Sequence, residues 1–295
     1  MEKIEGDIRG RVSQIELGRR RRVLCGGNSS LPFLSDPYQR PLLALEVYDV
    51  LPPDFNPFLK EAWAELDIIG RVKKAESFSP DLICLRFIAS DPDLNLATVE
   101  ESGELLKRLE GETSCPLIVT GCGNHSSDEE LLPLLGDAIK GANALFGVSV
   151  DKNYRMLAVS CLANGHAIIA ETPLDINMAK QLNIMISDLG FPVGRIVMHH
   201  VTGALGYGLE YCYSIMEKCR LAALEGDDML SPVMMNFVGE ETWKIKEARE
   251  SEELGINWEV ATSIAYLEAG ADILVVSHPD SLSRLQKILD TLCPQ

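Results

Sequence analysis

The chain has no Cys-x-x-Cys pair, although eight of its 295 residues are cysteine. Structural zinc sites and iron–sulfur clusters usually draw their ligands from closely spaced cysteine pairs. Several cysteines instead lie inside apolar runs, as in DLICLRF and AVSCLA, which is typical of buried free thiols. We therefore expect neither a zinc knuckle nor an iron–sulfur cluster in this chain.

Positive charge and long apolar runs are also scarce. The 27 Lys and Arg residues are outnumbered by 44 Asp and Glu residues, which gives a net charge of −17. Such a charge repels phosphates and excludes nucleic acid as a main partner, although Arg19–Arg22 forms one basic run that we expect at a solvated strand edge. No apolar run approaches the roughly 20 residues that span a bilayer. Because Met1–Gly10 is polar and charged, it is not a signal peptide, and we expect a soluble cytoplasmic protein without a membrane partner.

Motifs of covalent and metal catalysis are missing too. There is no Gly-x-Ser-x-Gly elbow, and no lysine falls at the end of a predicted strand. Barrel metallohydrolases usually carry His-x-His on their first strand, where this chain reads EVYD at Glu46–Asp49. The adjacent His199 and His200 point to opposite sides of a strand, so at most one of them can face a site. We predict no catalytic residue and no metal site.

What the sequence does contain is one pattern repeated eight times: a short apolar run, a loop, and an amphipathic helix. The runs lack polar–apolar alternation, as expected for parallel strands covered on both faces. They are Pro41–Asp49, Asp81–Phe87, Cys115–Gly121, Ala144–Ser149, His166–Glu171, Arg195–His199, Pro232–Gly239 and Asp272–Ser277. Eight such units predict an α/β fold, a (β/α)₈ TIM barrel over residues 41–295. A doubly wound open sheet is the alternative.

The first 40 residues stand apart from this pattern. Residues 6–18 and 20–33 read as two strands, which predicts an N-terminal β-hairpin arm over residues 1–40, packed across one end of the barrel. Helix starts are expected at Ser126–Glu130 and at His278–Leu282.

Ligands of such barrels bind at the carboxyl ends of the strands and in the loops that follow them. The loop after Arg195–His199 is rich in glycine, with Gly203, Gly206 and Gly208, which indicates a backbone that approaches something closely. Amides, hydroxyls and glycines dominate the strand-end residues, which are Glu46, Asp49, Arg86, Gly121, Gly123, Asn124, His125, Ser149, Asp151, Glu171, Asp175, Asn177, His199, His200, Thr202, Gly203, Asn236, Gly239, Ser277 and His278. This composition indicates a rim that holds a polar ligand rather than one that attacks it.

Two long stretches of the sequence resemble a known family. They are TPLDINMAKQLNIMISDLGFPVGRIVM at Thr172–Met198 and TGALGYGLEYCYSIMEKCRLAALEGDDML at Thr202–Leu230, supported by GGNSSLPF, PLLALEVYD, PDLICLRF and GEETWKIKEA. These segments are similar to the small (delta) subunit of the corrinoid iron–sulfur protein, which belongs to the acetyl-CoA decarbonylase/synthase complex. The similarity runs in matching order over nearly the whole chain.

The resemblance implies a barrel that caps a cobalamin shared with a large corrinoid iron–sulfur subunit, and the large subunit carries the [4Fe–4S] cluster. In this family the cobalt accepts a methyl group from a methyl-pterin methyltransferase and passes it to acetyl-CoA synthase, in the reductive acetyl-CoA pathway. Both of those enzymes would be transient partners. The cofactor carries out the reaction, while the protein positions and shields it.

The resemblance also directs attention to the glycine-rich loop and to polar residues beside it. A corrin is broad and has amides around its edge, which backbone N–H groups, asparagines and threonines can bind. The residues expected to contact the cofactor are Thr202, Gly203, Ala204, Leu205, Gly206 and Tyr207, with Asn124, Asp175, Asn177 and Asn236 beside them. Two rim segments depart from the family pattern, namely His199-His200 and Ala248–Glu259.

Two other functions stay open at this point. A stand-alone TIM-barrel methyltransferase would bind a methyl-pterin itself and would use Asp and Asn side chains such as Asp175, Asn177 and Asn236 to hold the pterin ring. An unrelated barrel lyase or metallohydrolase is the other possibility. Cobalamin that appears only with a large partner favours the corrinoid subunit, pterin binding by the chain alone favours the methyltransferase, and stoichiometric metal favours the third class.

Overall fold

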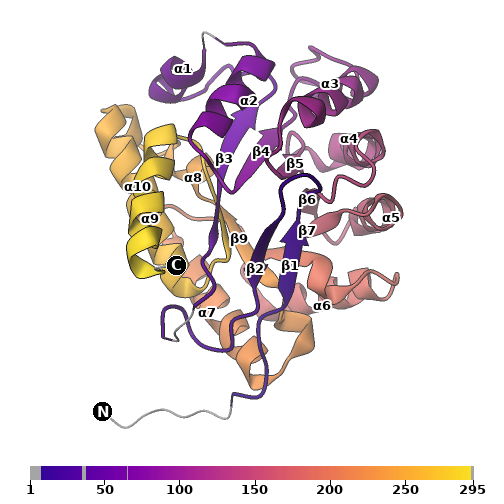
Figure 1. Cartoon of the computed structure of the whole chain (residues 1–295), viewed down its shortest axis with the longest axis vertical. Coiled ribbons are helices and arrows are strands. Elements are labelled where there is room, and N and C mark those ends of the chain that lie inside the picture. Colours follow the sequence, from indigo (N-terminus) through magenta and orange to yellow (C-terminus); the bar gives the residue numbers. More distant parts are fainter. Residues whose placement is uncertain (1–7, 35–37, 65, 294–295) are drawn as a thin grey trace.

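Eight parallel strands close into a barrel with helices outside it (Figure 1). The structure, a computed structural model, describes residues 8–34, 38–64 and 66–293. Around the barrel the strands follow the order β3 (Leu42–Tyr48), β4 (Leu82–Arg86), β5 (Leu117–Thr120), β6 (Leu145–Ser149), β7 (Ala167–Glu171), β8 (Ile196–His199), β9 (Val233–Phe237) and β10 (Ile273–Val276), and β10 pairs back onto β3. This closure confirms the predicted (β/α)₈ barrel and excludes the open sheet.

The strands lack alternation because the barrel buries both of their faces. Ala44 and Cys84 belong to the cluster that fills the interior, whereas Leu43 and Ile83 belong to the cluster beneath the helices. Parallel sheets covered on both faces need apolar residues at nearly every position. The absence of alternation was therefore the correct signal for this fold.

The helices that cover the barrel follow the strands in regular order (Figure 1). They are α1 (Pro57–Trp63), α2 (Ile68–Ser77), α3 (Val99–Glu112), α4 (His125–Ala138), α5 (Tyr154–Asn164), α6 (Ile176–Ser187), α7 (Leu209–Glu225), α8 (Val238–Thr242), α9 (Glu252–Ala269) and α10 (Pro279–Leu292), with short 3₁₀ turns η1 (Val193–Arg195), η2 (Asp228–Leu230) and η3 (Glu247–Arg249). The expected start at His278 is confirmed, since its ring accepts a hydrogen bond from the backbone N–H of Asp280. Within the described part of the chain, no helix has the length and apolar character that crossing a membrane requires.

An N-terminal hairpin closes the end of the barrel where the strands begin. Its strands β1 (Gln14–Leu17) and β2 (Val23–Gly26) pair antiparallel. Ile15, Leu17 and Cys25 are buried in the same cluster as Leu42, at the start of β3. The hairpin therefore seals the bottom of the barrel, as predicted, while the first seven residues of the arm lie outside the described residues.

The basic run lies in the turn of this hairpin and contacts α3, so it is more than a solvated edge. Arg20 donates from Nη1 to the backbone oxygens of Glu110, Gly111 and Thr113, at 2.8, 3.2 and 3.0 Å. Arg19 pairs with the Glu110 carboxylate at 2.7 Å. The last carbonyls of a helix have no partner within it, so Arg20 caps α3 by donating to them.

We expect Arg20→Ala to lower the free energy of unfolding by about 1 kcal/mol, because carbonyl oxygens at the end of α3 lose a charged donor. Urea denaturation measures this loss. Arg22→Ala is the matched control, since the Arg22 side chain is 68% exposed and pairs with Glu16 at 3.3 Å; its effect should stay below about 0.5 kcal/mol. Equal losses in both variants would contradict the capping role.

Candidate functional site

The last inward-facing residues of the strands form a mostly polar layer at the mouth of the barrel. Successive strand residues alternate between the interior and the helices, so the inward row of Leu42 and Ala44 continues to Glu46. The matching residues of the other strands are Arg86, Thr120, Val148, Glu171, His199, Phe237 and Ser277. Below this layer the interior is apolar. Chemistry at this end of the barrel is therefore confined to the layer and to the loops above it.

A cavity of about 230 Å³ opens above the layer. Arg86, Thr120, Glu171, His199 and Glu240 are among the side chains that line it. Thr120 is 1% exposed, and its hydroxyl has no hydrogen-bond partner among the described residues. The cavity thus presents two carboxylates, those of Glu171 and Glu240, which suit a ligand that carries hydrogen-bond donors.

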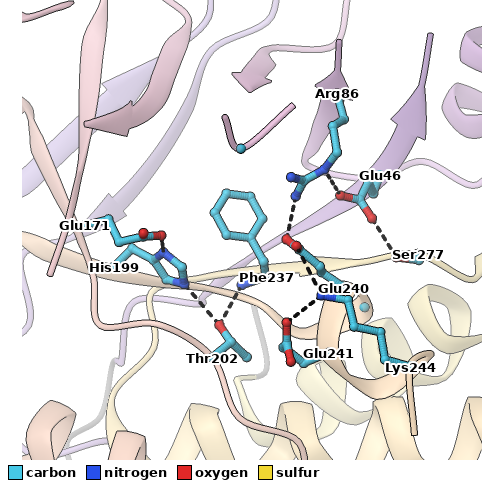
Figure 2. Close-up of polar contacts among 12 residues, drawn as sticks. Glu46, Arg86, Glu171, His199, Thr202, Phe237, Glu240, Glu241, Lys244 and Ser277 are labelled. Carbon is cyan, nitrogen blue, oxygen red and sulfur yellow. Dashed lines mark hydrogen bonds and ion pairs between the residues drawn. The ribbon is translucent and has the colours of Figure 1, made fainter. Parts of the chain in front are cut away.

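Arg86 is the central charge of the mouth (Figure 2). Its Nε donates to Glu46 Oε1 at 2.8 Å, and its Nη2 donates to Glu240 Oε2 at 2.9 Å. The guanidinium also lies 5.3 Å from the centroid of the Phe237 ring. The positive charge of Arg86 lowers the pKa of Glu240 below its ordinary value. Glu240 therefore favours its ionised form, and the two carboxylates hold the arginine in place.

The network extends from Arg86 to the neighbouring elements. The hydroxyl of Ser277, just after β10, donates to Glu46 Oε2 at 2.7 Å. On the other side, Lys244 pairs with Glu240 at 3.4 Å and with Glu241 at 2.9 Å (Figure 2). The contacts join β3, β4, α8 and the end of β10 into one hydrogen-bonded unit.

A second polar chain crosses the mouth from β7 to β9 through His199 (Figure 2). His199 Nδ1 lies 2.8 Å from Glu171 Oε2, and its Nε2 lies 3.1 Å from the hydroxyl of Thr202. The backbone N–H of Phe237 donates to the same hydroxyl at 3.1 Å. A carboxylate at Nδ1 selects the tautomer that carries its proton there, so the Thr202 hydroxyl donates to Nε2. His199 faces the mouth, whereas His200 is buried on the other side of the strand, as the sequence predicts.

Behind the mouth, Glu259 of α9 is fully buried against the start of α10. Its carboxylate accepts hydrogen bonds from the Trp243 indole at 3.0 Å, from the Ser277 N–H at 2.6 Å and from the His278 N–H at 3.4 Å. Burial raises its pKa from an ordinary value of 4.5 to about 7. Because Ser277 also binds Glu46, Glu259 supports the mouth from behind.

The glycine-rich loop after β8 is held by α9. The Tyr266 hydroxyl accepts from the N–H of Gly203 at 2.8 Å and donates to its carbonyl at 2.7 Å. The Trp258 indole donates to the Leu205 carbonyl at 2.9 Å. A Cβ on Gly203 would lie 2.8 Å from the carbonyl carbon of Gly208, so what this glycine approaches is its own loop. Gly206, with φ +80° and open space around it, is the glycine that faces outward.

None of the polar residues that the sequence placed beside this loop is among the residues that line the mouth cavity. Asn124 and Asp175 are exposed and act as N-caps of α4 and α6, and Asn177 is exposed in the first turn of α6. Asn236 has the same strand orientation as Met234, towards the helices, where it is fully buried and neither of its side-chain polar atoms has a partner among the described residues. Ala204 and Thr202 are buried, while Leu205, Gly206 and Tyr207 are exposed.

Exposed apolar side chains lie on the loops after β4, β7 and β8 and in the first turn of α6. They are between 39% and 65% exposed and comprise Leu96, Leu174, Met178, Val201, Leu205 and Tyr207. Single exposed apolar residues are ordinary, but a group at the ligand-binding end of a barrel indicates a docking surface. A sequence pattern could not reveal this group, because its members come from separate loops.

The mouth itself is built from strand-end residues that the sequence analysis named but did not select, namely Glu46, Arg86, Glu171, His199 and Ser277, together with Glu240. The strand-end residues share one signal, a position two residues beyond an inward-facing apolar residue, whereas Glu240 on α8 has no such signal. Among the described residues, no group of three or more His, Cys, Asp and Glu side chains has the arrangement of a metal site.

Comparison with solved structures gives the class of barrel. The chain is similar in fold to Xanthomonas albilineans dihydropteroate synthase with 4-aminobenzoic acid, with a TM-score of 0.60 and 14% identity over 87% of this chain and 94% of that one. It is equally similar to Yersinia pestis dihydropteroate synthase with a pterine-sulfa conjugate, with a TM-score of 0.60 and 12% identity over 94% and 98%. These likenesses show the fold, a TIM barrel.

Comparison of sequences gives the family. Residues 14–289 match the model of the CO dehydrogenase/acetyl-CoA synthase delta subunit, and the chain belongs to this family. It is 31% identical to the acetyl-CoA decarbonylase/synthase complex subunit delta of Methanosarcina mazei, over 93% of this chain and 67% of that protein. With the corresponding subunit of Methanothermobacter thermautotrophicus the identity is 28%, over 96% and 76%. The resemblance inferred from the sequence is thereby confirmed.

We expect Glu46→Gln to destabilise the fold by about 3 kcal/mol, because it removes one of the two carboxylates that neutralise the buried Arg86. Glu241→Gln, which weakens only the pair with the exposed Lys244, should cost less than about 0.5 kcal/mol. Urea denaturation of both variants measures the difference. A small loss in Glu46→Gln would show that Glu240 alone neutralises the arginine.

The raised pKa of Glu259 predicts a specific pH dependence of stability. Between pH 4.5 and 7 the folded state binds the Glu259 proton more tightly than the unfolded state does. The contribution of Glu259 to the free energy of unfolding therefore falls as pH rises and is lowest above pH 7. We therefore expect the free energy of unfolding of Glu259→Gln, relative to that of the wild type, to increase by on the order of 3 kcal/mol from pH 4.5 to 8. Urea titrations at several pH values measure the free energy of unfolding of both proteins. The difference between the two proteins removes the contributions of the titrating groups that they share. Parallel curves would contradict the prediction.

Proposed function

We propose that this chain is the barrel subunit of a corrinoid methyl-transfer complex, in which it covers a cobalamin carried with a large iron–sulfur subunit. In this role the chain is a non-catalytic or co-catalytic subunit. The methyl group would pass from a methyl-pterin methyltransferase to the cobalt and on to acetyl-CoA synthase. The observation that carries the proposal is the mouth of the barrel, polar at its centre and apolar at its rim, in a chain of the delta-subunit family.

The residues of the mouth fit the edge of a corrin better than they fit an enclosed substrate. A cavity of about 230 Å³ cannot enclose a macrocycle of that size, so the ring would lie across the mouth. Its edge amides would donate to the carboxylates of Glu171 and Glu240. The exposed side chains of Leu205 and Tyr207 would pack against the ring or its carrier domain.

The bound corrinoid would supply the nucleophilic cobalt, and the residues of this chain would supply position and exclusion of water. Arg86 and His199 already have their hydrogen-bond partners inside the mouth. Held in this way, they keep the polar surface fixed. This agrees with a subunit that shields the reaction instead of catalysing it.

A stand-alone methyl-pterin methyltransferase is the second candidate, and the likeness of fold to dihydropteroate synthases favours it. The positions of the carboxylate and amides expected to hold a pterin argue against this function. Asp175 caps α6, Asn177 is exposed beside it, and Asn236 points to the helices. Purification separates the two functions: the corrinoid subunit is colourless alone and shows cobalamin absorbance only with its large partner, whereas the methyltransferase binds a methyl-pterin by itself.

We expect Leu205→Glu to weaken cobalamin retention in the two-subunit complex at least about tenfold, because it places a charge on the apolar rim. Leu24→Glu is the matched control. Both leucines are 39% exposed, but Leu24 lies on β2 at the closed end of the barrel. Cobalamin absorbance after gel filtration measures retention, and thermal unfolding by circular dichroism checks the fold. Equal retention in both variants would contradict the position assigned to the corrinoid.

A further inference from the structure

The carboxylate of Glu259 lies outside the mouth, yet it is bonded to two segments that shape the mouth. Its Oε1 accepts from the N–H of Ser277 at 2.6 Å, and its Oε2 accepts from the Trp243 indole at 3.0 Å and from the N–H of His278 at 3.4 Å. Ser277 and His278 connect β10 to α10, and Trp243 directly follows α8. One side chain of α9 therefore holds both segments.

The first route from Glu259 to the mouth runs through Ser277. The N–H of Ser277 donates to Glu259, while its hydroxyl donates to Glu46 Oε2 at 2.7 Å. Glu46 Oε1 in turn accepts from Arg86 Nε at 2.8 Å (Figure 2). The position of Ser277 relative to Glu259 therefore sets where Glu46 holds the arginine.

The second route runs through α8, which packs directly on the same carboxylate. A Cβ on Gly239 would lie 2.7 Å from Glu259 Oε1 and would overlap the Ser277 hydroxyl. The next residue of the chain is Glu240, which accepts from Arg86 Nη2 at 2.9 Å. Because closely packed buried atoms transmit displacement, a shift of the Glu259 carboxylate reaches Arg86 from this side as well.

The three groups that donate to Glu259 are two backbone N–H groups and an indole N–H, none of which can accept a proton from it. An ionised carboxylate satisfies such donors, and its negative charge also suits the N-terminal end of α10. A protonated carboxyl group is a weaker acceptor and directs an O–H of its own towards donors. Protonation of Glu259 therefore weakens its hold on Ser277 and Trp243.

Both forms of Glu259 are populated near neutral pH. Burial raises its pKa to about 7, and the hydrogen bonds from Ser277, Trp243 and His278 oppose this rise. Charged and titratable groups on the elements around this carboxylate and its partners are Glu46 of β3, Lys74 of α2, Arg86 of β4, Glu240 of α8, Glu252 of α9, and His278 and Asp280 at the start of α10. Burial lowers the pKa of His278 from its ordinary value of 6.5, so the His278 ring titrates on the acidic side of Glu259.

We propose that Glu259 is a positioning residue whose charge sets how tightly the mouth holds its ligand. The ionised carboxylate keeps Ser277 and α8 in place, and with them Arg86, whereas protonation releases both segments. Ligand binding therefore favours the ionised form and releases a proton, since the coupling between the two sites is reciprocal. The inference rests on the proposed function for the identity of the ligand, a cobalamin held with the large subunit. The coupling inside the chain does not depend on that ligand.

The first test uses the full chain without a ligand. In proton–nitrogen NMR spectra, the indole N–H of Trp243 reports on Glu259, and the Nε–H of Arg86 reports on the mouth. We expect both signals to titrate with one midpoint at about pH 7 in the wild type. Neither signal should titrate there in Glu259→Gln, because the amide does not ionise. Glu252→Gln is the matched control on the same helix, since Glu252 lies 3.2 Å from His278 Nε2, and it should keep the transition.

The second test uses the complex with the large subunit. With a pKa of about 7, the ionised fraction of Glu259 falls from about 0.9 at pH 8 to about 0.1 at pH 6. We therefore expect the dissociation constant for cobalamin to rise up to about tenfold between these pH values in the wild type and in Glu252→Gln. Glu259→Gln should bind at both pH values as weakly as the wild type does at pH 6. Equilibrium dialysis followed by cobalamin absorbance measures the constant.

The outcomes separate this inference from the proposed function. A Trp243 signal that titrates without the Arg86 signal overturns the inference, as does a transition that persists in Glu259→Gln or disappears in Glu252→Gln. Equal cobalamin binding by the wild-type complex at pH 6 and pH 8 overturns it too, while the proposed function stands. A wild-type complex that binds no cobalamin at either pH overturns the proposed function, and the NMR signals still decide whether Glu259 acts on Arg86. If Glu259→Gln fails to fold, the carboxyl carbon signal of Glu259 in the wild type supplies the midpoint that the Arg86 signal must share.

Discussion

The mouth of the barrel depends on one buried positive charge, the guanidinium of Arg86. A buried charge is costly unless it is paired, and here it is shared between Glu46 of β3 and Glu240 of α8. Glu46 in turn accepts from Ser277, which is bound from behind by Glu259. Removing any member leaves a buried polar group without its partner. The network therefore fixes the positions of α8 and of the segment after β10 relative to the sheet.

The barrel could be predicted from the sequence because its evidence is repeated. Eight apolar runs separated by helices have few arrangements other than a closed parallel sheet, and errors of a residue or two at strand ends do not change that conclusion. The mouth could not be predicted in the same way, because it depends on the orientation of single residues. Asn236 and Phe237 are neighbours, yet one faces the helices and the other the mouth. Glu240 reaches Arg86 across 154 positions of sequence, which no local pattern records.

The glycine-rich loop illustrates a different limit. Its glycines correctly indicated a close approach of backbone, but the sequence could not say to what. At Gly203 the neighbour is the backbone of Gly208 in the same loop, while at Gly206 it is open space. The residues that anchor the loop, Tyr266 and Trp258, lie on α9. Trp258 falls in Ala248–Glu259, the segment noted above as a departure from the family pattern, and Tyr266 lies beyond it. The ligand-facing role therefore stays a prediction for the exposed tip of the loop and not for its base.

The way in which the mouth is filled bears on the kind of protein this is. Both nitrogens of His199 and two donor nitrogens of Arg86 are hydrogen-bonded within the mouth. These contacts make the surface rigid and keep its charges fixed. Rigidity of this kind suits a protein that must meet a large, preformed cofactor edge repeatedly without rearranging, since little ordering entropy is lost at each encounter.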